Sequence, residues 1–254
     1  MRDVRFKLDP KIRFSSRVNN YIRYRPRYPS DIINFLKEKH ILTDGSIIAD
    51  IGSGTGILSE IFLKNGNVVY GIEPNADMRK AAEESLTKHS NFISLDGSAE
   101  KTGLDKERID LITVGQAFHW FDIDKTKKEF RRILKPDGYV ILVWNNRRKN
   151  GKNFSQEYEK LLLKYGKDYK EVRKQQGAVD KFFNYEKKIF YNYQELNFEG
   201  FKGRFLSASY IPLEDEPIFE TMISELESDF KKYEKDELIR VEYDTEVYYG
   251  HLNT

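Results

Sequence analysis

The sequence predicts an α/β fold, in which a mostly parallel sheet carries helices on both of its faces. Between residue 31 and about residue 145, short apolar segments alternate with helical segments. The apolar segments are nearly continuous, as is typical of strands that are buried on both faces. Regular strand–helix alternation of this kind is typical of parallel sheets.

The predicted elements follow one another in a regular order. Helices are expected over residues 31–41, 57–66, 75–89 and 123–138, and strands over residues 46–52, 67–73, 91–97, 109–117 and 139–146. Residues 64–66 and 135–138 have the composition of helix ends that are followed by tight turns.

The sequence changes character after residue 150. Residues 154–184 are rich in charged residues and predict mostly helix. A strand is expected over 187–196, followed by a helix that Asn197 can cap. Pro217 suits the first turn of a further helix that reaches Lys235. A last strand is expected over 238–250. We expect a single domain, 1–254, made of an N-terminal segment (1–30), a core (31–145), a helical insertion (146–184) and C-terminal strands and helices (185–254).

The composition narrows the functional classes. The 43 basic and 41 acidic residues give a net charge of +2, which is too even for binding nucleic acid through bulk charge. No segment approaches the roughly 18 apolar residues of a membrane span, and the first residues lack the apolar core of a signal peptide. With no cysteine and four scattered histidines, no metal site is predicted. We therefore expect a cytoplasmic protein, either a monomer or a homodimer.

A local excess of positive charge marks the N-terminus. Residues 1–28 contain nine lysines and arginines against two aspartates, Asp3 and Asp9. Such a segment is either a solvated basic arm or a segment that helps to attract an anionic ligand.

The most informative segment is IIADIGSGTG (residues 47–56), in which an apolar strand ends at Asp50 and three glycines follow at alternate positions. Glycine adopts positive φ at little cost and has no Cβ. A strand that ends in this way and leads into a helix brings bare backbone to the carboxyl edge of a parallel sheet, where α/β folds hold ligands. The alternative is that the glycines serve only a tight turn.

Two further strands of the predicted sheet end in a carboxylate. Glu73 ends the next strand, 23 residues beyond Asp50, where an acid can accept hydrogen bonds from both hydroxyls of a ribose. Asp96 ends the third strand, where a carboxylate can accept from an exocyclic amine. Three acidic strand ends in register predict a site for a nucleoside.

The glycine spacing distinguishes between nucleoside ligands. A dinucleotide site usually has the pattern Gly-x-Gly-x-x-Gly and binds a pyrophosphate. This segment has the pattern Gly-x-Gly-x-Gly directly after Asp50. A carboxylate at that place would repel a diphosphate, but it suits a ligand with ammonium and sulfonium charges. S-adenosylmethionine fits this description.

With these motifs the sequence resembles the class I S-adenosylmethionine-dependent methyltransferases. The matching segments, in the expected order, are DIGSGTG (50–56), GIEPNADM (71–78), DGSAE (96–100), LITVGQAFHWF (111–121) and LKPDGYV (134–140). The segments YIRYRPRYP, HWF and SASYIP resemble more narrowly the trans-aconitate methyltransferase-like group, which acts on small molecules. The resemblance implies a Rossmann-like sheet of seven strands, with 187–194 and 239–250 as strands six and seven and the last strand antiparallel.

The resemblance also implies which residues bind the cofactor, with S-adenosylhomocysteine as product. Asp50 would help to hold the methionine ammonium, Glu73 would bind the ribose hydroxyls, and Asp96 would accept from the adenine amine. Gln116 would lie near the transferable methyl. The full expected set is Asp50, Gly52, Gly54, Glu73, Pro74, Asn75, Met78, Asp96, Ser98, Ala99 and Gln116.

Methyl transfer from a sulfonium needs positioning and desolvation more than a fixed set of catalytic groups. His119 is the candidate catalytic residue. Three alternatives are open for its role: a base for the acceptor proton, a substrate contact or a packing residue.

By resemblance, residues 1–30 form a lid, and the arginines of this lid would clamp a carboxylate. The alternative is a surface helix whose tyrosines pack on the sheet edge. The expected substrate contacts are Tyr21, Tyr24, Arg25, Tyr28, Trp120 and Tyr210.

The predicted function is therefore methyl transfer to a small-molecule acceptor, either a carboxylate or a hydroxyl. A nucleic-acid or protein methyltransferase is one alternative, which the basic segment 1–28 favours. However, GQAFHW (115–120) differs from the Asn/Asp-Pro-Pro-aromatic segment that grips a flipped base. The remaining alternatives are a non-catalytic cofactor-binding protein and a Rossmann oxidoreductase that binds NAD.

Overall fold

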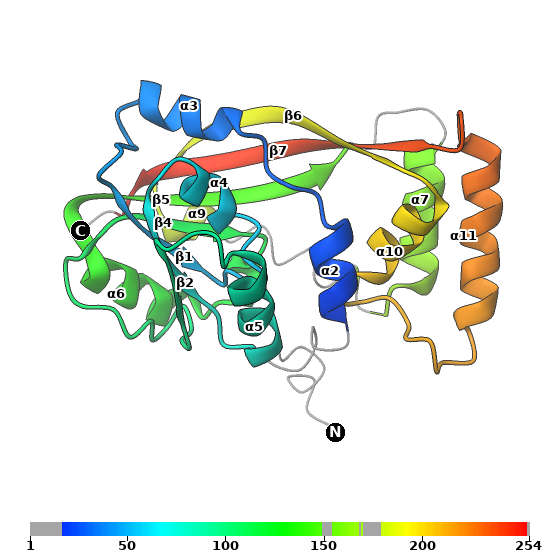
Figure 1. The fold of residues 1–254 in the computed structure, drawn as a ribbon, viewed down its shortest axis with the longest axis horizontal. Coiled ribbons are helices and arrows are strands. Elements are labelled where there is room, and N and C mark those ends of the chain that lie inside the picture. Colours follow the sequence, from blue (N-terminus) through cyan, green and yellow to red (C-terminus); the bar gives the residue numbers. More distant parts are fainter. Residues whose placement is uncertain (1–16, 149–153, 168, 170–178, 253–254) are drawn as a thin grey trace.

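The computed structural model describes residues 17–148, 154–167, 169 and 179–252. At its centre lies a seven-stranded sheet in the order β3-β2-β1-β4-β5-β7-β6 (Figure 1). The strands are β1 (Ile47–Ile51), β2 (Val68–Ile72), β3 (Phe92–Leu95), β4 (Ile109–Gly115), β5 (Leu134–Arg147), β6 (Glu186–Leu196) and β7 (Ile239–His251). Strands β1 to β5 pair in parallel, and β7 pairs antiparallel with both β5 and β6. The predicted fold class is confirmed.

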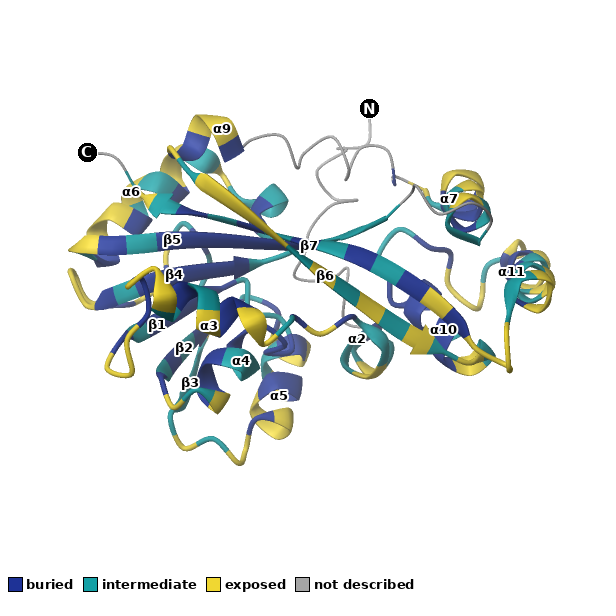
Figure 2. Cartoon of the chain, turned by 90° about the horizontal axis from the view of Figure 1, so that it is seen from above, coloured by how far each residue is buried: buried dark blue, intermediate teal, exposed yellow. Residues whose placement is uncertain are grey.

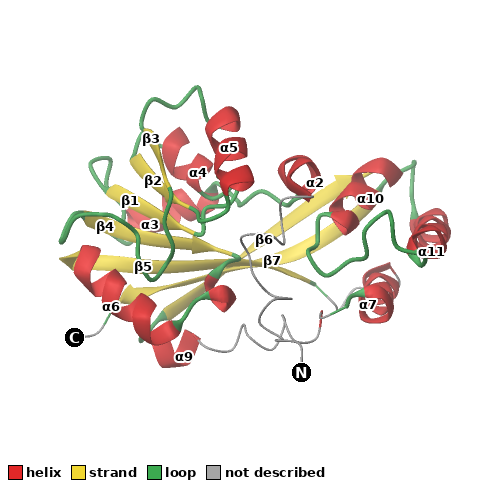
Figure 3. Cartoon of the chain, turned by 90° about the horizontal axis from the view of Figure 1, so that it is seen from below, coloured by secondary structure: helices red, strands yellow, loops and turns green. Residues whose placement is uncertain are grey.

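Helices cover both faces of this sheet. Helices α3 (Asp31–Glu38), α4 (Ser59–Lys64) and α5 (Ala76–Ser85) lie on one face, and α6 (Ile123–Ile133) and α9 (Val179–Phe182) lie on the other (Figure 3). Alternate residues of β1 enter different cores: Ile48 packs under α3 and α4, whereas Ala49 and Ile51 pack under α6 and α9. Because both faces are covered, the central strands are buried along their length, whereas β6 at the edge is largely exposed (Figure 2).

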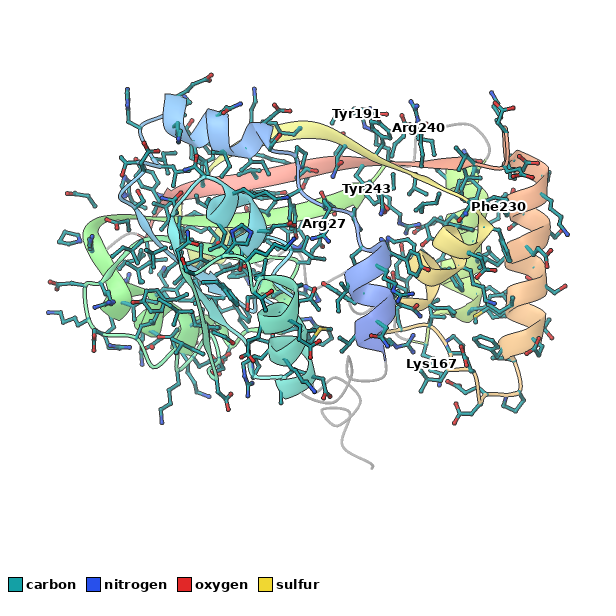
Figure 4. All side chains as sticks on the ribbon, in the orientation of Figure 1. Arg27, Lys167, Tyr191, Phe230, Arg240 and Tyr243 are labelled. Carbon is teal, nitrogen blue, oxygen red and sulfur yellow. The ribbon has the colours of Figure 1, made fainter. Side chains whose placement is uncertain are left out.

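A third hydrophobic cluster lies beyond the parallel strands, around the first half of β7. Helices α7 (Phe154–Tyr165), α10 (Phe198–Leu206) and α11 (Phe219–Tyr233) supply most of it. Figure 4 labels two of its members, Phe230 on α11 and Tyr243 on β7. Helix α2 (Val18–Tyr24) packs against α10. At this contact a Cβ on Gly203 would lie 2.1 Å from the ring of Tyr24, so the two helices approach closely.

Several element ends differ from the predicted ones. The helix expected over 123–138 ends at Ile133, and the next residue already pairs with Ile109 of β4. Residues 135–138 then bulge out of the ladder, because pairing resumes with Tyr139 opposite Leu111. Pro217 precedes α11, which begins at Phe219, instead of occupying its first turn.

The C-terminal part and the insertion follow the predicted order of elements. Asn197 caps α10, since its Oδ1 accepts a hydrogen bond from the backbone N of Gly200 at 2.9 Å. The segment 146–184 contains α7 and α9, while residues 149–153, 168 and 170–178 lie outside the described residues. Residues 1–16, which carry the first part of the basic segment, also lie outside them.

Candidate active site

The carboxyl ends of β1 and β4 form the topological switch point of the sheet. Strands β2 and β3 lie on one side of β1, while β4 and β5 lie on the other, so the loops after β1 and β4 leave in opposite directions. A pocket of about 230 Å³, which we call the main pocket, lies at this place. It is lined by Tyr21, Gly52, Gly54, Glu73, Pro74, Met78, Ser98, Ala99, Glu100, Gly115, Gln116, Ala117, Trp120 and Phe121.

A smaller pocket of about 50 Å³ adjoins the main pocket. The two share Tyr21, Gly52, Gly115 and Gln116 as lining residues. We call it the arginine pocket, because two arginines lie on its wall. Its other lining residues are Arg25, Pro26, Tyr28, Asp50, Ser53, Ile57, Leu58, Asn145 and Arg204.

Two glycines after β1 shape the wall of the main pocket, and one of them, Gly52, also lines the arginine pocket. Gly52 and Gly54 have φ values of +67° and +55°, which residues with a Cβ rarely adopt. A Cβ on Gly52 would lie 2.6 Å from the Cβ of Ala117, so the turn itself requires this glycine. A Cβ on Gly54 would meet no atom within 4 Å. The backbone of Gly54 therefore lies bare on the pocket wall, where a ligand can approach closely.

Glu73 connects the loop after β2 to the glycine loop. Its Oε2 accepts a hydrogen bond from the backbone N of Gly54 at 3.0 Å, and its Oε1 accepts one from the backbone N of Asn75 at 2.9 Å. Burial raises the pKa of Glu73, although the two backbone donors oppose the rise. Each carboxylate oxygen can accept a second hydrogen bond. The side chain can therefore hold two neighbouring hydroxyls of a ligand in the main pocket.

Asp50 is fully buried at the end of β1 and lines the arginine pocket. Its Oδ2 accepts from the hydroxyl of Ser59 at 2.6 Å, and its Oδ1 accepts from the hydroxyl of Thr113 at 3.2 Å. Burial raises the pKa of Asp50 from 3.8 to about 6, although both hydrogen bonds oppose the rise. Neither partner is a cation. A positively charged ligand would therefore stabilise this carboxylate.

Most residues expected around an adenine come together in the main pocket. Pro74, Met78, Ser98 and Ala99 all line it, and the thioether of Met78 is a soft surface for a flat ring. Asn75 has a structural role and is not part of the lining. Its Oδ1 accepts from the backbone N of Met78 at 3.0 Å and so caps α5.

Asp96 is not brought into the pocket. Its side chain is 74% exposed, and it forms an ion pair with Arg79 at 3.2 Å. The chain turns sharply just after it, where Ser98 and Lys101 form an isolated bridge. Because of this turn, Glu100 lines the pocket in place of Asp96. Sequence reasoning missed Glu100, although it belongs to the same DGSAE motif.

The loop after β4 forms the opposite wall. Gln116 directly follows β4, as predicted. Its φ of +60° is unusual for a residue with a side chain. A short 3₁₀ helix, Phe118–Trp120, follows. Trp120 lines the main pocket, but His119 lines neither pocket, and its ring lies 4.8 Å from the ring of Trp120. A role for His119 in proton transfer stays a prediction.

The tyrosines expected at the substrate separate into two groups. Tyr21 lines both pockets and Tyr28 lines the arginine pocket. Tyr24 packs against Gly203 of α10 and lines neither pocket. Tyr210 also lines neither, and its ring lies 4.9 Å from that of Tyr169.

Two arginines of the described part of the basic segment are bound into the fold. Arg17 is 7% exposed and donates to the carbonyl oxygens of Leu206, at 2.7 Å, and Ile211. Arg25 donates from its Nη2 to the carbonyl of Ser207 at 2.9 Å. These carbonyls lie at and just after the C-terminal end of α10, where cations are favoured. The two arginines are therefore not part of a solvated arm.

The residues of the site fit S-adenosylmethionine. The buried Asp50 suits a cationic group, Glu73 suits the ribose, and the bare backbone at Gly54 allows close approach. Among the described residues, no group of three or more histidine or acidic side chains could hold a metal ion. Nor does any helix in the described part of the chain have the length and apolar character to cross a membrane.

Comparison with known sequences supports this assignment for part of the chain. Residues 49–142 match the family model described as a methyltransferase domain. An uncharacterised methyltransferase-like protein of Schizosaccharomyces pombe is 31% identical over 156 residues, which are 61% of this chain and 59% of that protein. An uncharacterised methyltransferase of Mycobacterium bovis is 33% identical over 139 residues, 55% of this chain and 54% of that protein. The chain thus spans little more than half the length of these relatives.

Solved structures show the same fold over nearly the whole chain. A protein assigned as a type II methyltransferase from Anaeromyxobacter dehalogenans matches with a TM-score of 0.69 at 19% identity, covering 90% of this chain and 98% of that one. A second protein, from Anabaena variabilis, is assigned as a methyltransferase from an antibiotic biosynthesis pathway. It matches with a TM-score of 0.62 at 24% identity, covering 91% of this chain and 99% of that one. These structures show the fold alone, while the family match and the sequence relatives support the predicted enzyme class for the segment 49–142. The narrower trans-aconitate-like group stays a prediction.

Proposed function

We propose that the protein transfers a methyl group from S-adenosylmethionine to a small-molecule acceptor, through a carboxylate or a hydroxyl of that acceptor. One observation carries the proposal: within the matched methyltransferase segment, Gly54 and Glu73 line the main pocket and Asp50 lines the adjoining arginine pocket. A nucleoside with a cationic side chain needs these three features together.

The chain's own residues would bind and orient the cofactor along the two pockets. The ribose would lie against Glu73, with the base between Met78 and the 98–99 turn in the main pocket. The methionine end would extend past Gly52 toward Asp50 in the arginine pocket. The shared lining residues Gly115 and Gln116 lie between the two ends, where the reacting methyl group is expected.

When bound, S-adenosylmethionine supplies a methyl carbon to a lone pair of the acceptor, and the C–S electron pair returns to sulfur to give S-adenosylhomocysteine. Around the methyl position, Tyr21, Trp120 and Phe121 supply aromatic walls that exclude water. A carboxylate acceptor has no proton to lose, whereas a hydroxyl must give one to a base. Because His119 lines neither pocket, a hydroxyl acceptor would need another base, and Glu100 in the wall of the main pocket is the candidate.

Three of the four arginines in the described part of the basic segment have partners within the fold, which favours a small acceptor over a nucleic acid, whereas the fourth, Arg23, is exposed. Arg17 and Arg25 hold carbonyls of α10 and its following loop and do not form an exposed basic surface. Arg27 forms an ion pair with Glu60 at 2.7 Å. Phosphate binding requires lysines and arginines that are free to reach the backbone.

Calorimetric titration with S-adenosylmethionine and S-adenosylhomocysteine tests the cofactor site. We expect Glu73→Gln to weaken binding by about tenfold or more, because an amide replaces one acceptor with a donor that faces the Gly54 N–H. Glu220→Gln, an exposed change on α11, is the matched control. Turnover is then measured as S-adenosylhomocysteine release with a panel of carboxylic acids and alcohols. A folded wild-type protein that binds neither compound would refute the proposal.

A further inference from the structure

Arg204 is a buried arginine whose charge is not matched by an acid. It lies in the last turn of α10 and is only 6% exposed. Within the described residues, the one hydrogen bond of its side chain runs from Nε to the hydroxyl of Tyr243 at 3.3 Å. The two terminal nitrogens of its guanidinium group are thus available on the wall of the arginine pocket.

Arg25 lies on the wall of the same pocket. Its Nη2 donates to the carbonyl of Ser207, and its guanidinium lies 4.8 Å from the centre of the Tyr21 ring. Its Nε is buried and has no hydrogen-bond partner in the described part of the chain. Burial, followed by repulsion from Arg204, lowers the pKa of Arg25. Two guanidinium groups therefore share one small buried space.

Another buried arginine nearby shows how the fold normally neutralises such a charge. Arg147 forms an ion pair with Glu159 at 3.0 Å, donates to the hydroxyl of Tyr169 at 2.8 Å and stacks on the ring of Tyr158. Neither Arg25 nor Arg204 has an ion pair of this kind among the described residues. Leaving a buried charge without a counter-ion is costly.

We propose that Arg25 and Arg204 form a carboxylate-binding subsite in the arginine pocket. The proposal rests on the proposed function and names the group that this part of the site recognises. Two planar guanidinium forks can hold a carboxylate by several parallel N–H···O bonds, which a lysine pair cannot do. The hydroxyl of Tyr243 donates to Oε1 of Gln194 at 2.8 Å and accepts from Arg204. Tyr243 is therefore a positioning residue for the subsite.

Two carboxylates can reach this subsite. One is the α-carboxylate of the cofactor, because the same pocket holds Asp50, and a zwitterion needs an anionic and a cationic wall. The other is a carboxylate of the acceptor, which must approach the methyl group near Gly115 and Gln116. Both sources use the same chemistry at the same two arginines.

Paired titrations distinguish the two sources. Wild type, Arg204→Gln and Arg25→Gln are titrated with S-adenosylhomocysteine and with 5′-methylthioadenosine, which lacks the amino-acid portion. Each protein, with and without S-adenosylhomocysteine, is also titrated with citrate, succinate and the neutral succinamide. Arg17→Gln is the matched control, because Arg17 is equally buried against α10 but lines neither pocket. Circular dichroism confirms that each variant is folded.

If the subsite holds the cofactor, both pocket variants lose about ten- to a hundredfold in affinity for S-adenosylhomocysteine and none for 5′-methylthioadenosine. If it holds the acceptor, the cofactor affinity is unchanged and binding of the anionic carboxylates, but not succinamide, is lost. Unchanged affinities for every ligand would overturn the proposal, as would an equal loss in Arg17→Gln. Wild-type protein that binds no S-adenosylhomocysteine would refute the proposed function, while the citrate titration of the free protein would still test the subsite.

Discussion

The buried carboxylate of Asp50 makes stability depend on pH in a defined way. Replacing it by asparagine keeps the shape: the amide oxygen can accept from one of the two hydroxyls, of Ser59 or Thr113, and the amide nitrogen can donate to the oxygen of the other. The change removes a charge that burial disfavours. The pKa difference between 3.8 and about 6, at about 1.4 kcal/mol per pKa unit, corresponds to about 3 kcal/mol. At pH 7 we therefore expect the free energy of unfolding of Asp50→Asn to exceed that of wild type by up to this amount.

The sign follows from the protons that each state holds. Between about pH 4 and pH 6, folded Asp50 keeps a proton that the unfolded chain has released. The contribution of Asp50 to stability therefore falls as the pH rises through this window, and its cost is complete above pH 6. The difference between Asp50→Asn and wild type should be small near pH 4 and should level off near pH 7.

Urea unfolding at half-unit steps from pH 4.5 to 7.5 measures this difference. Asp215→Asn makes the same chemical change at an exposed position and should follow the wild-type curve. A free-energy difference between Asp50→Asn and wild type that stays constant across this range would refute the reasoning, because it would show that burial does not shift the Asp50 titration. At the same time Asp50→Asn should bind S-adenosylmethionine more weakly, since the cation loses its counter-charge.

Three further changes test the placement of single residues. Asp96→Ala should leave the S-adenosylhomocysteine affinity within about threefold of wild type in calorimetry, because Asp96 pairs with Arg79 outside the pocket; a larger loss would place Asp96 at the ligand. Gly203→Ala should lower the unfolding free energy by about 1–3 kcal/mol in urea titrations, because the new Cβ would meet the Tyr24 ring; an unchanged midpoint would contradict the close packing of α2 on α10. His119→Gln should keep the same cofactor affinity, because the ring lines neither pocket; a tenfold loss would put His119 in contact with the cofactor.

The positions of the glycine loop and of Glu73 could be predicted from the sequence because both features are local. A strand, a turn that needs positive φ and a helix lie within one short segment, so the position of Gly52 and Gly54 follows from chain geometry alone. Glu73 ends the neighbouring strand, and parallel strands in register bring their ends together. Its hydrogen bond to Gly54 is the direct result.

The prediction was weaker where a residue depends on a turn or on a distant segment. Asp96 was placed by its strand, but the short turn after β3 leaves it at the surface and brings Glu100 to the pocket. Tyr24 and Tyr21 lie on the same short helix, and only the position of α10 decides which of them faces the pocket. No local pattern contains that information.

Arg204 is the clearest residue that sequence reasoning missed, although a signal was present. It lies three residues after Phe201, on the same face of α10, and an arginine among buried aromatic residues needs a partner. The place of Arg204 beside a second arginine was not predictable, because Arg25 reaches the pocket from the C-terminal end of α2, 179 residues earlier in the sequence.

The two halves of the site therefore have different origins. The nucleoside half comes from loops that follow consecutive parallel strands, and these loops lie within the segment that matches the methyltransferase family model. The arginine half is assembled from α2, which precedes the matched segment, and from α10, which follows it. Changes in these two helices can alter the recognised anion without disturbing the glycine loop. If the subsite holds the acceptor, acceptor choice should depend on residues outside the matched segment, such as Arg25 and Arg204.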